Sequence, residues 1–233
     1  MVSGLVALFI SRRVIEVVEH GAVIPHFISM MRRLLSTPRA RFATLGVSLF
    51  WSAAIVLRVL LVAWAPVVLL ITETSEIAKL TMFTAFGIAI GSILAPKLIP
   101  ITFLRRARVA AYLMGVAIVL LSVVDTLWAA RLVLLLVCVA GGLFVVPINA
   151  ALQDIGHRSI GSGGAVGIQN FFENLAMLIA SGIYTIVMGL GVDPVSTMIV
   201  LGVLVLIAAF VVSRNLPPDT YDSAAILSEV SGE

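Results

Sequence analysis

Long apolar runs dominate the chain, and charged residues fall mainly between them. Each run is close to the roughly 20 apolar residues with which a helix crosses the hydrocarbon core of a bilayer. The short segments between the runs contain charge, proline or glycine, which favours turns at a membrane surface. The pattern predicts six transmembrane helices, at residues 42–71, 80–99, 107–124, 128–149, 164–188 and 194–212.

The two ends of the chain differ from this core. Residues 2–10 form an apolar segment about half as long as a span, and Arg12 and Arg13 follow it, an order opposite to that of a secretory signal peptide. We expect this segment to be the end of a truncated transmembrane helix, and residues 14–35 to be a basic, partly amphipathic connector on the inner membrane surface. The predicted division is a helix end and connector at residues 1–41, a six-helix bundle at 42–213 and a polar cytoplasmic tail at 214–233.

The distribution of positive charge predicts an orientation. The chain is 61% hydrophobic and only 12% charged, which excludes an ordinary water-soluble domain. Of its 15 lysine and arginine residues, only Lys79 and Arg131 fall in connections on one side of the predicted bundle. The positive-inside rule therefore predicts a bacterial inner-membrane protein with both termini in the cytoplasm, and Trp64 and Trp128 near the outer interface. The cytoplasmic positive residues are Arg12, Arg13, Arg32, Arg33, Arg39, Arg41, Lys97, Arg105, Arg106, Arg108, Arg158 and Arg214.

Two charged residues lie deep inside predicted spans, Arg58 in the first and Glu173 in the fifth. A charge at mid-depth costs about 2.5–3.5 kcal/mol on insertion scales, so each must face protein, a partner charge or a water-filled cavity. Their nominal depths differ by roughly 10 Å, a gap that a long arginine side chain partly covers. Two interpretations stay open: an ion pair that stabilises the bundle, or a cationic site for an anionic group.

Further polar residues surround Glu173 in the sequence. Gln169 lies one helical turn before it, and Asn170 and Asn174 repeat the same spacing. Interhelical hydrogen bonding would explain one such amide, whereas four adjacent polar groups favour a cavity. Asn149, near the inner end of the fourth span, extends this predicted polar lining toward the cytoplasm.

Two pairs of glycines have the small-xxx-small spacing that lets membrane helices approach closely. Gly87 and Gly91 lie in the second predicted span, and Gly163 and Gly167 lie at the start of the fifth. We expect both pairs to serve helix packing.

No enzymatic arrangement is evident. The GSGGAVG stretch at residues 161–167 has neither the Rossmann spacing nor the Lys-Ser/Thr of a P-loop. His20, His26 and His157 are scattered without metal-ligand spacing, and Cys138 is the only cysteine, so no intrachain disulfide can form. We expect no enzyme activity, no cofactor, no metal site and no nucleic-acid partner.

Two segments resemble the bacterial lysophospholipid transporter family of the major facilitator superfamily. They are RFATLGVSLFWSAAIVLRVLLVAWAPV, at residues 41–67, and GGLFVVPINAALQDIGHRSIGSGGAVGIQNFFENLAML, at residues 141–178. The resemblance extends over roughly residues 40–212 and implies the C-terminal half of a twelve-helix transporter, whose N-terminal six-helix half is missing here. An all-α, polytopic six-helix bundle is the fold that it implies.

The family's activity is to move lysophospholipids, such as lysophosphatidylethanolamine, from the outer to the inner leaflet for reacylation. The resemblance implies this substrate, contact with membrane lipids, and an acyltransferase/acyl-carrier-protein synthetase as partner. In this interpretation Arg58 receives the substrate's phosphate and Glu173 its ammonium group. The other expected substrate-binding residues are Gln169, Asn170, Asn174 and Asn149.

Other interpretations of the sequence remain. The chain could belong to an exporter of a drug or metabolite from the same superfamily, or be a non-transporting, truncated membrane subunit. For a transporter, a separately encoded first half, a homodimer and an upstream start codon are all compatible with the sequence.

Overall fold

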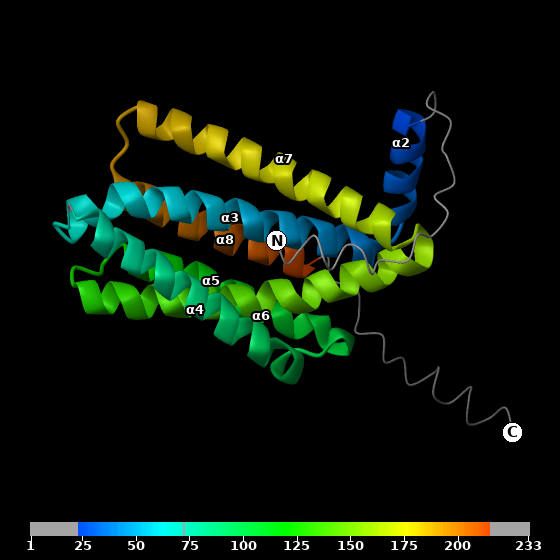
Figure 1. Cartoon of the computed structure of the whole chain (residues 1–233), viewed down its shortest axis with the longest axis horizontal. Helices are drawn as coiled ribbons and strands as arrows, with labels where there is room; N and C mark the ends of the chain where they lie inside the picture. Colours follow the sequence, from blue (N-terminus) through cyan, green and yellow to red (C-terminus); the bar gives the residue numbers. More distant parts are fainter. Residues whose placement is uncertain (1–22, 72, 215–233) are drawn as a thin grey trace, which may run out of the picture.

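The computed structural model describes residues 23–71 and 73–214, and among these residues it contains helices and no strand (Figure 1). The predicted all-α fold is therefore confirmed. The elements are α2 (Val23–Leu34), α3 (Pro38–Val68), α4 (Thr74–Leu98), the 3-10 helix η1 (Ile101–Arg106), α5 (Ala107–Leu121), α6 (Leu127–Ser159), α7 (Ser162–Gly189) and α8 (Pro194–Arg214).

The six predicted spans correspond to the helices α3 to α8, with two differences in length. Within the described residues, five helices are long and apolar enough to cross a membrane, and α5, with 15 residues, is not one of them. The fourth span was predicted to end at residue 149, but α6 continues through Pro147 to Ser159. Its last turns carry Asp154, His157 and Arg158, polar residues that suit a helix emerging from the membrane. The apolar helices confirm a multi-pass membrane protein.

Local sequence explains where these helices begin and end. Thr37 caps α3 by accepting a hydrogen bond from the backbone N–H of Ala40, and Pro38 occupies the first helical position. After α7, Gly191 takes a left-handed conformation with φ of 78°, which a glycine adopts without strain. Asp193 then caps α8 by accepting from the backbone N–H of Ser196 at 2.9 Å. Hydrogen bonds from the side chain and backbone of Ser196 hold the pKa of the Asp193 carboxyl below its usual value.

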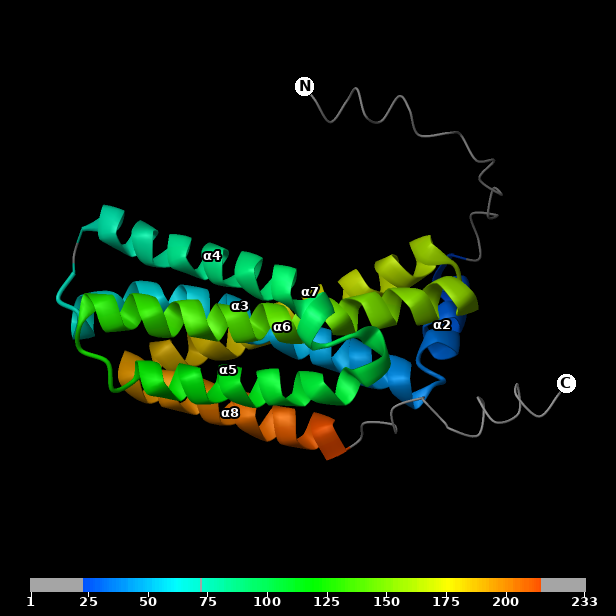
Figure 2. The same cartoon turned by 90° about the horizontal axis from the view of Figure 1, so that it is seen from below.

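The helices α3 and α6 form the centre of the bundle. The helix α3 packs against α6, α7 and α8, which are distant from it in the sequence. The helix α6 also packs against α4 and α5 (Figure 2). Trp64 of α3 lies near the end of the helix as predicted, but it is completely buried, so its ring is a core residue and is not exposed as an interfacial tryptophan would be. Trp128 is exposed near the opposite end of the bundle from α2, and the Arg131 guanidinium lies 4.7 Å from its ring.

The most extensive helix contact joins α4 to α6, and glycines make it possible. A Cβ atom at Gly87 would lie 2.7 Å from the backbone oxygen of Leu135. One at Gly91 would lie 3.0 Å from the Cα of Gly142 and would overlap the carbonyl of Val139. The predicted packing role of Gly87 and Gly91 is therefore confirmed.

The second glycine pair differs. In the part of the chain that the structure describes, no heavy atom lies within 4 Å of the position that a Cβ would take at Gly163 or Gly167. These residues leave an open strip on α7 instead of packing inside the bundle, so for the described residues the packing prediction is wrong. In Figure 1, α7 and α4 lie on opposite sides of α3.

Candidate functional site

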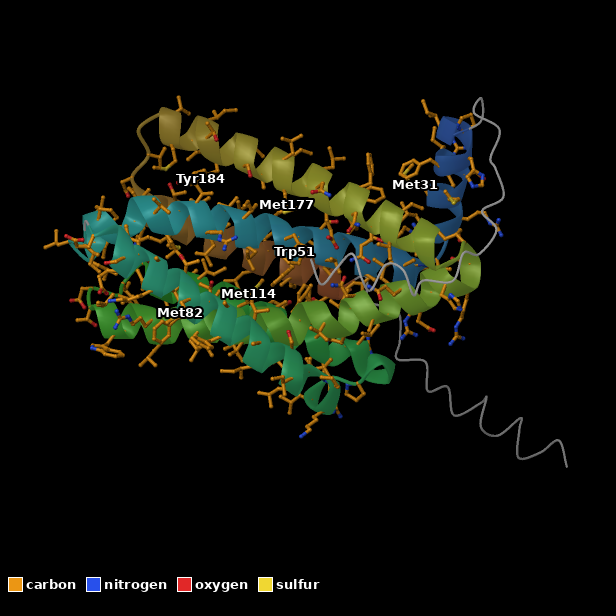
Figure 3. The ribbon with its side chains drawn as sticks, viewed as in Figure 1. Met31, Trp51, Met82, Met114, Met177 and Tyr184 are labelled. Carbon is orange, nitrogen blue, oxygen red and sulfur yellow. The ribbon has the colours of Figure 1, made fainter. Side chains whose placement is uncertain are left out.

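A cavity of about 540 Å³ lies between α3 and α4. These two helices make few contacts with each other, and α5, α6 and one residue of α7 close the space between them. The volume is within the roughly 300–1,000 Å³ of small-molecule sites. Trp51 of α3, Met82 of α4, Met114 of α5 and Met177 of α7 belong to the lining and are labelled in Figure 3. The full lining is Phe50, Trp51, Ala53, Ala54, Ile55, Leu57, Arg58, Leu61, Ala78, Thr81, Met82, Thr84, Ala85, Ile88, Met114, Ile118, Val137, Cys138 and Met177.

Arg58 is the one charged residue in this lining. Its side chain is exposed at the rim, and among the described residues it forms no hydrogen bond and no ion pair. Two threonines, Thr81 and Thr84, also line the cavity, but their hydroxyls donate to backbone carbonyls of α4. The cavity thus combines an apolar wall with a single guanidinium whose five N–H donors are available to an anion.

A second polar cluster joins α6 to α7. Gln169 is only 7% exposed, and its Nε2 donates to Asn149 Oδ1 at 2.8 Å and to Glu173 Oε1 at 2.6 Å. The two hydrogens of one amide nitrogen are sufficient for these two bonds. Gln169 therefore fixes one carboxylate oxygen of Glu173 and links that carboxylate to the fourth predicted span.

The other two amides on α7 lie on a different side of the helix. Asn170 and Asn174 are exposed, and the Asn174 side chain donates to the backbone oxygen of Asn170 at 2.7 Å. With Gly163 and Gly167 they lie in a row at helical spacing. The expected single patch of four polar side chains is thus divided: Gln169 and Glu173 turn toward α6, and the asparagines do not.

The structure brings the cavity and the cluster near each other without joining them. Met177 lines the cavity and follows Glu173 by four residues, so slightly more than one turn of α7, about 6 Å along its axis, separates them. Both Arg58 and Glu173 belong to the described residues, and no hydrogen bond or ion pair connects them. The alternative in which they form a stabilising ion pair is therefore not what the structure contains.

Several lining residues were not predicted as site residues. Met82, Met114 and Met177 are apolar, and in a membrane span such residues give no signal that distinguishes a cavity wall from a lipid-facing surface. The unbranched methionine side chain adapts to ligands of different shape, which suits a wall that binds a flexible chain.

Replacing Gln169 with leucine is expected to lower the free energy of unfolding by about 1–2 kcal/mol, because Asn149 and Glu173 lose their common donor. The measurement is a denaturing-detergent titration of the reconstituted chain. As a control, Asn170→Leu replaces the next residue by leucine as well, and the exposed side chain of Asn170 forms no bond to another helix among the described residues. Equal stability of the two variants would contradict the linking role of Gln169.

Comparison with known proteins gives close relatives. The chain is 44% identical over 165 residues to the lysophospholipid transporter LplT of Photorhabdus laumondii, a match that covers 71% of this chain and 42% of that protein. It is 40% and 39% identical over 182 residues to the proteins of the same name from Klebsiella pneumoniae and Escherichia coli, matches that cover 78% of this chain and 46% of each relative. The chain thus spans less than half the length of these relatives. No protein-family model and no solved structure matches it.

Proposed function

We propose that the chain forms the C-terminal half of a transporter of the LplT family, because its matched part is 39–44% identical to lysophospholipid transporters of that name. The complete protein would move lysophospholipids, such as lysophosphatidylethanolamine, across a membrane. The observation that carries this proposal, beside the relationship, is the guanidinium of Arg58 in the lining of an apolar cavity, where no other described residue pairs with it.

A lysophospholipid has the groups that this cavity can bind. Its single acyl chain is apolar and flexible, and its phosphodiester carries a negative charge. Arg58 would bind the phosphate through charge-assisted hydrogen bonds, which are about twice as strong as neutral ones. The apolar wall between α3 and α4 would hold the acyl chain, with the rim near Arg58 as the boundary between the two.

Glu173 would receive the ammonium of an ethanolamine headgroup. Gln169 occupies its Oε1, and the described residues supply no hydrogen bond to Oε2, which leaves this oxygen for a cationic ligand. The carboxylate lies one helical turn from Met177 in the cavity wall. The two charged groups would thus contact the two ends of one zwitterionic headgroup. Asn149 would act indirectly, through the bond that it accepts from Gln169.

The exposed asparagines on α7, Asn170 and Asn174, support the proposal that another part of the complete transporter covers this side of the helix. The side-chain amides of Asn170 and Asn174 would be costly against lipid, because acyl chains offer no hydrogen-bond partner. The relatives are more than twice as long as the matched segment, so the N-terminal six-helix half, or water held between the halves, would cover this side of α7. Rocking of the two halves would then expose the site alternately on each side.

The remaining assignments are also proposals. The basic end of the bundle would face the cytoplasm and the bilayer would be the bacterial inner membrane, as the positive-inside rule predicts. Substrate would move from the outer to the inner leaflet, where an acyltransferase/acyl-carrier-protein synthetase partner would replace the missing acyl chain. Residues 1–41, 42–213 and 214–233 would serve as connector, bundle and tail.

Transport of labelled lysophosphatidylethanolamine into vesicles tests the proposal. Vesicles that contain the complete transporter, this chain together with the half that it lacks, should accumulate label in the inner leaflet faster than empty vesicles. Transport of an unrelated drug without transport of lysophospholipid would favour an exporter and contradict the proposal.

Replacing Glu173 with glutamine is expected to change headgroup preference. Transport of lysophosphatidylethanolamine should fall by about tenfold, because loss of one charge-assisted contact costs on the order of 1.5 kcal/mol. Transport of lysophosphatidylglycerol, which carries no ammonium, should fall much less. An equal decrease for both lipids would indicate that Glu173 does not recognise the cation.

A further inference from the structure

The helix α2 crosses the end of the bundle where α3 begins and α6 ends. It lies crosswise to the bundle axis in both views (Figures 1 and 2). One side of α2 packs on the bundle: the Phe27 ring meets the Phe171 ring of α7 edge-to-face at 5.4 Å, and Leu34 is completely buried. Figure 3 shows Met31 on this helix, and it also packs against the core. These contacts fix α2 against the first turns of α7.

Another side of α2 is apolar and uncovered by the described residues. Ile24 is 72% exposed and Ile28 is 38% exposed, and the two lie four residues apart on one row of the helix. Arg32 continues this row by one more turn. His26, Ser29 and Arg33 are exposed on the remaining polar side. This arrangement, an apolar row bordered by exposed arginines, is typical of helices that lie in a membrane surface.

The end of the bundle that carries α2 is strongly positive. Among the described residues at this end, Asp154 is the single carboxylate, and it already pairs with Arg158 at 3.1 Å. The other described carboxylates outside the predicted spans lie at the opposite end, in or beside the α3–α4, α5–α6 and α7–α8 connections. The lysine and arginine residues at the α2 end include Arg32 and Arg33 of α2 itself, Arg41 of α3, Lys97 of α4 and Arg108 of α5.

From the geometry and the charge we infer that α2 is a binding site for anionic phospholipids of the adjacent leaflet. Ile24 and Ile28 enter the acyl-chain boundary, and Arg32 and Arg33 bind the phosphates of acidic headgroups. A lipid occupant fits better than a protein occupant because α2 lies crosswise to the bundle axis with an apolar row on one side and exposed arginines at the edge of that row and on the polar side, so that its apolar and cationic groups lie at different depths, as acyl chains and phosphates do in a leaflet. The site is separate from the proposed transport cavity, since no residue of α2 lines that cavity.

Spin labels on the full chain test this site. The single cysteine is first removed by Cys138→Ala, and a nitroxide is then attached at Ile28→Cys or, as a matched control, at Ser29→Cys on the polar side. The chain is reconstituted in vesicles of phosphatidylcholine alone or of phosphatidylcholine with phosphatidylglycerol. Collision rates with oxygen, which concentrates among acyl chains, and with a water-soluble nickel chelate report the depth of each label.

The Ile28 label should collide several-fold more often with oxygen than with nickel, and the Ser29 label should show the reverse. Phosphatidylglycerol should increase the oxygen preference at position 28, and the double substitution Arg32→Gln with Arg33→Gln should remove that increase. Equal depth in both kinds of vesicle would overturn the anionic-lipid site. A label at position 28 that is open to nickel, or shielded from both reagents because protein covers it, would overturn insertion. None of these readouts requires transport, so failure of the proposed function would leave this test unaffected.

Discussion

Substitution of Gly91 by leucine is expected to separate α4 from α6 and to destabilise the bundle by at least about 3 kcal/mol. The new Cβ would overlap the carbonyl of Val139 and lie 3.0 Å from the Cα of Gly142. Both obstacles are backbone atoms, so no change of rotamer can relieve the contact. The rest of the leucine side chain would require still more space, and the helices would have to move apart along their whole contact.

The consequence extends to the proposed site because α4 supplies one wall of the cavity. Met82, Thr81 and Ala85 line the cavity from α4, and the contact with α6 holds that helix in place. We therefore expect Gly91→Leu to lose ligand binding together with stability.

Gly182→Leu provides the matched control. It places the same side chain in another apolar helix, α7, where no heavy atom of the described chain lies within 4 Å of the new Cβ. Unfolding in a denaturing detergent, followed by circular dichroism, should give Gly182→Leu nearly the stability of the original chain. If Gly91→Leu were equally stable, the close packing of α4 on α6 would be wrong.

The helices were predictable from sequence because each apolar run is long enough to require a membrane or a core. Their ends were less predictable. Residues 150–159 of α6 include Gln153, Asp154, His157 and Arg158, and such a mixed segment gives no hydropathy signal for continuing a span, yet its backbone hydrogen bonds keep the helix intact beyond Asn149. Conversely, Trp64 lies near a span end, where composition alone cannot distinguish an interfacial tryptophan from one that neighbouring helices cover.

Within the candidate site, periodicity gave the spacing but not the direction of side chains. Neighbouring residues of a helix point about 100° apart, so when Gln169 turns toward Asn149 its neighbour Asn170 cannot do so. Which of the two faces α6 depends on the rotation of α7, and that rotation is a property of the tertiary packing. Likewise, whether Arg58 has a partner among the described residues depends on the distance between α3 and α4. The local sequence does not determine that distance.

Replacing Arg58 with alanine should reduce lysophospholipid transport by the complete protein about 10- to 100-fold. The estimate follows from the loss of hydrogen bonds between a charged donor and the phosphate, about 1.5–3 kcal/mol. Stability should not fall, because among the described residues Arg58 has no partner to leave unpaired. Removing an exposed charge from a span can even favour insertion.

The variant Arg58→Lys tests whether the charge of Arg58 alone is sufficient for transport. Lysine keeps the positive charge but cannot make two parallel hydrogen bonds to a phosphate, so transport should be intermediate. If alanine and lysine reduced transport to the same extent while both chains remained folded, bidentate recognition would explain the result. If alanine caused no decrease, Arg58 would have no part in the site.

The most direct measurement is binding of two ligands to the original chain and to Arg58→Ala in lipid nanodiscs. Lysophosphatidylethanolamine and a monoacylglycerol with the same acyl chain differ in the phosphate-bearing headgroup, and this chain supplies Arg58 together with the apolar wall described above. The substitution should weaken binding of the lysophospholipid at least about tenfold and leave binding of the monoacylglycerol unchanged. Equal weakening of both ligands, or of neither, would contradict the assignment of Arg58 to the phosphate.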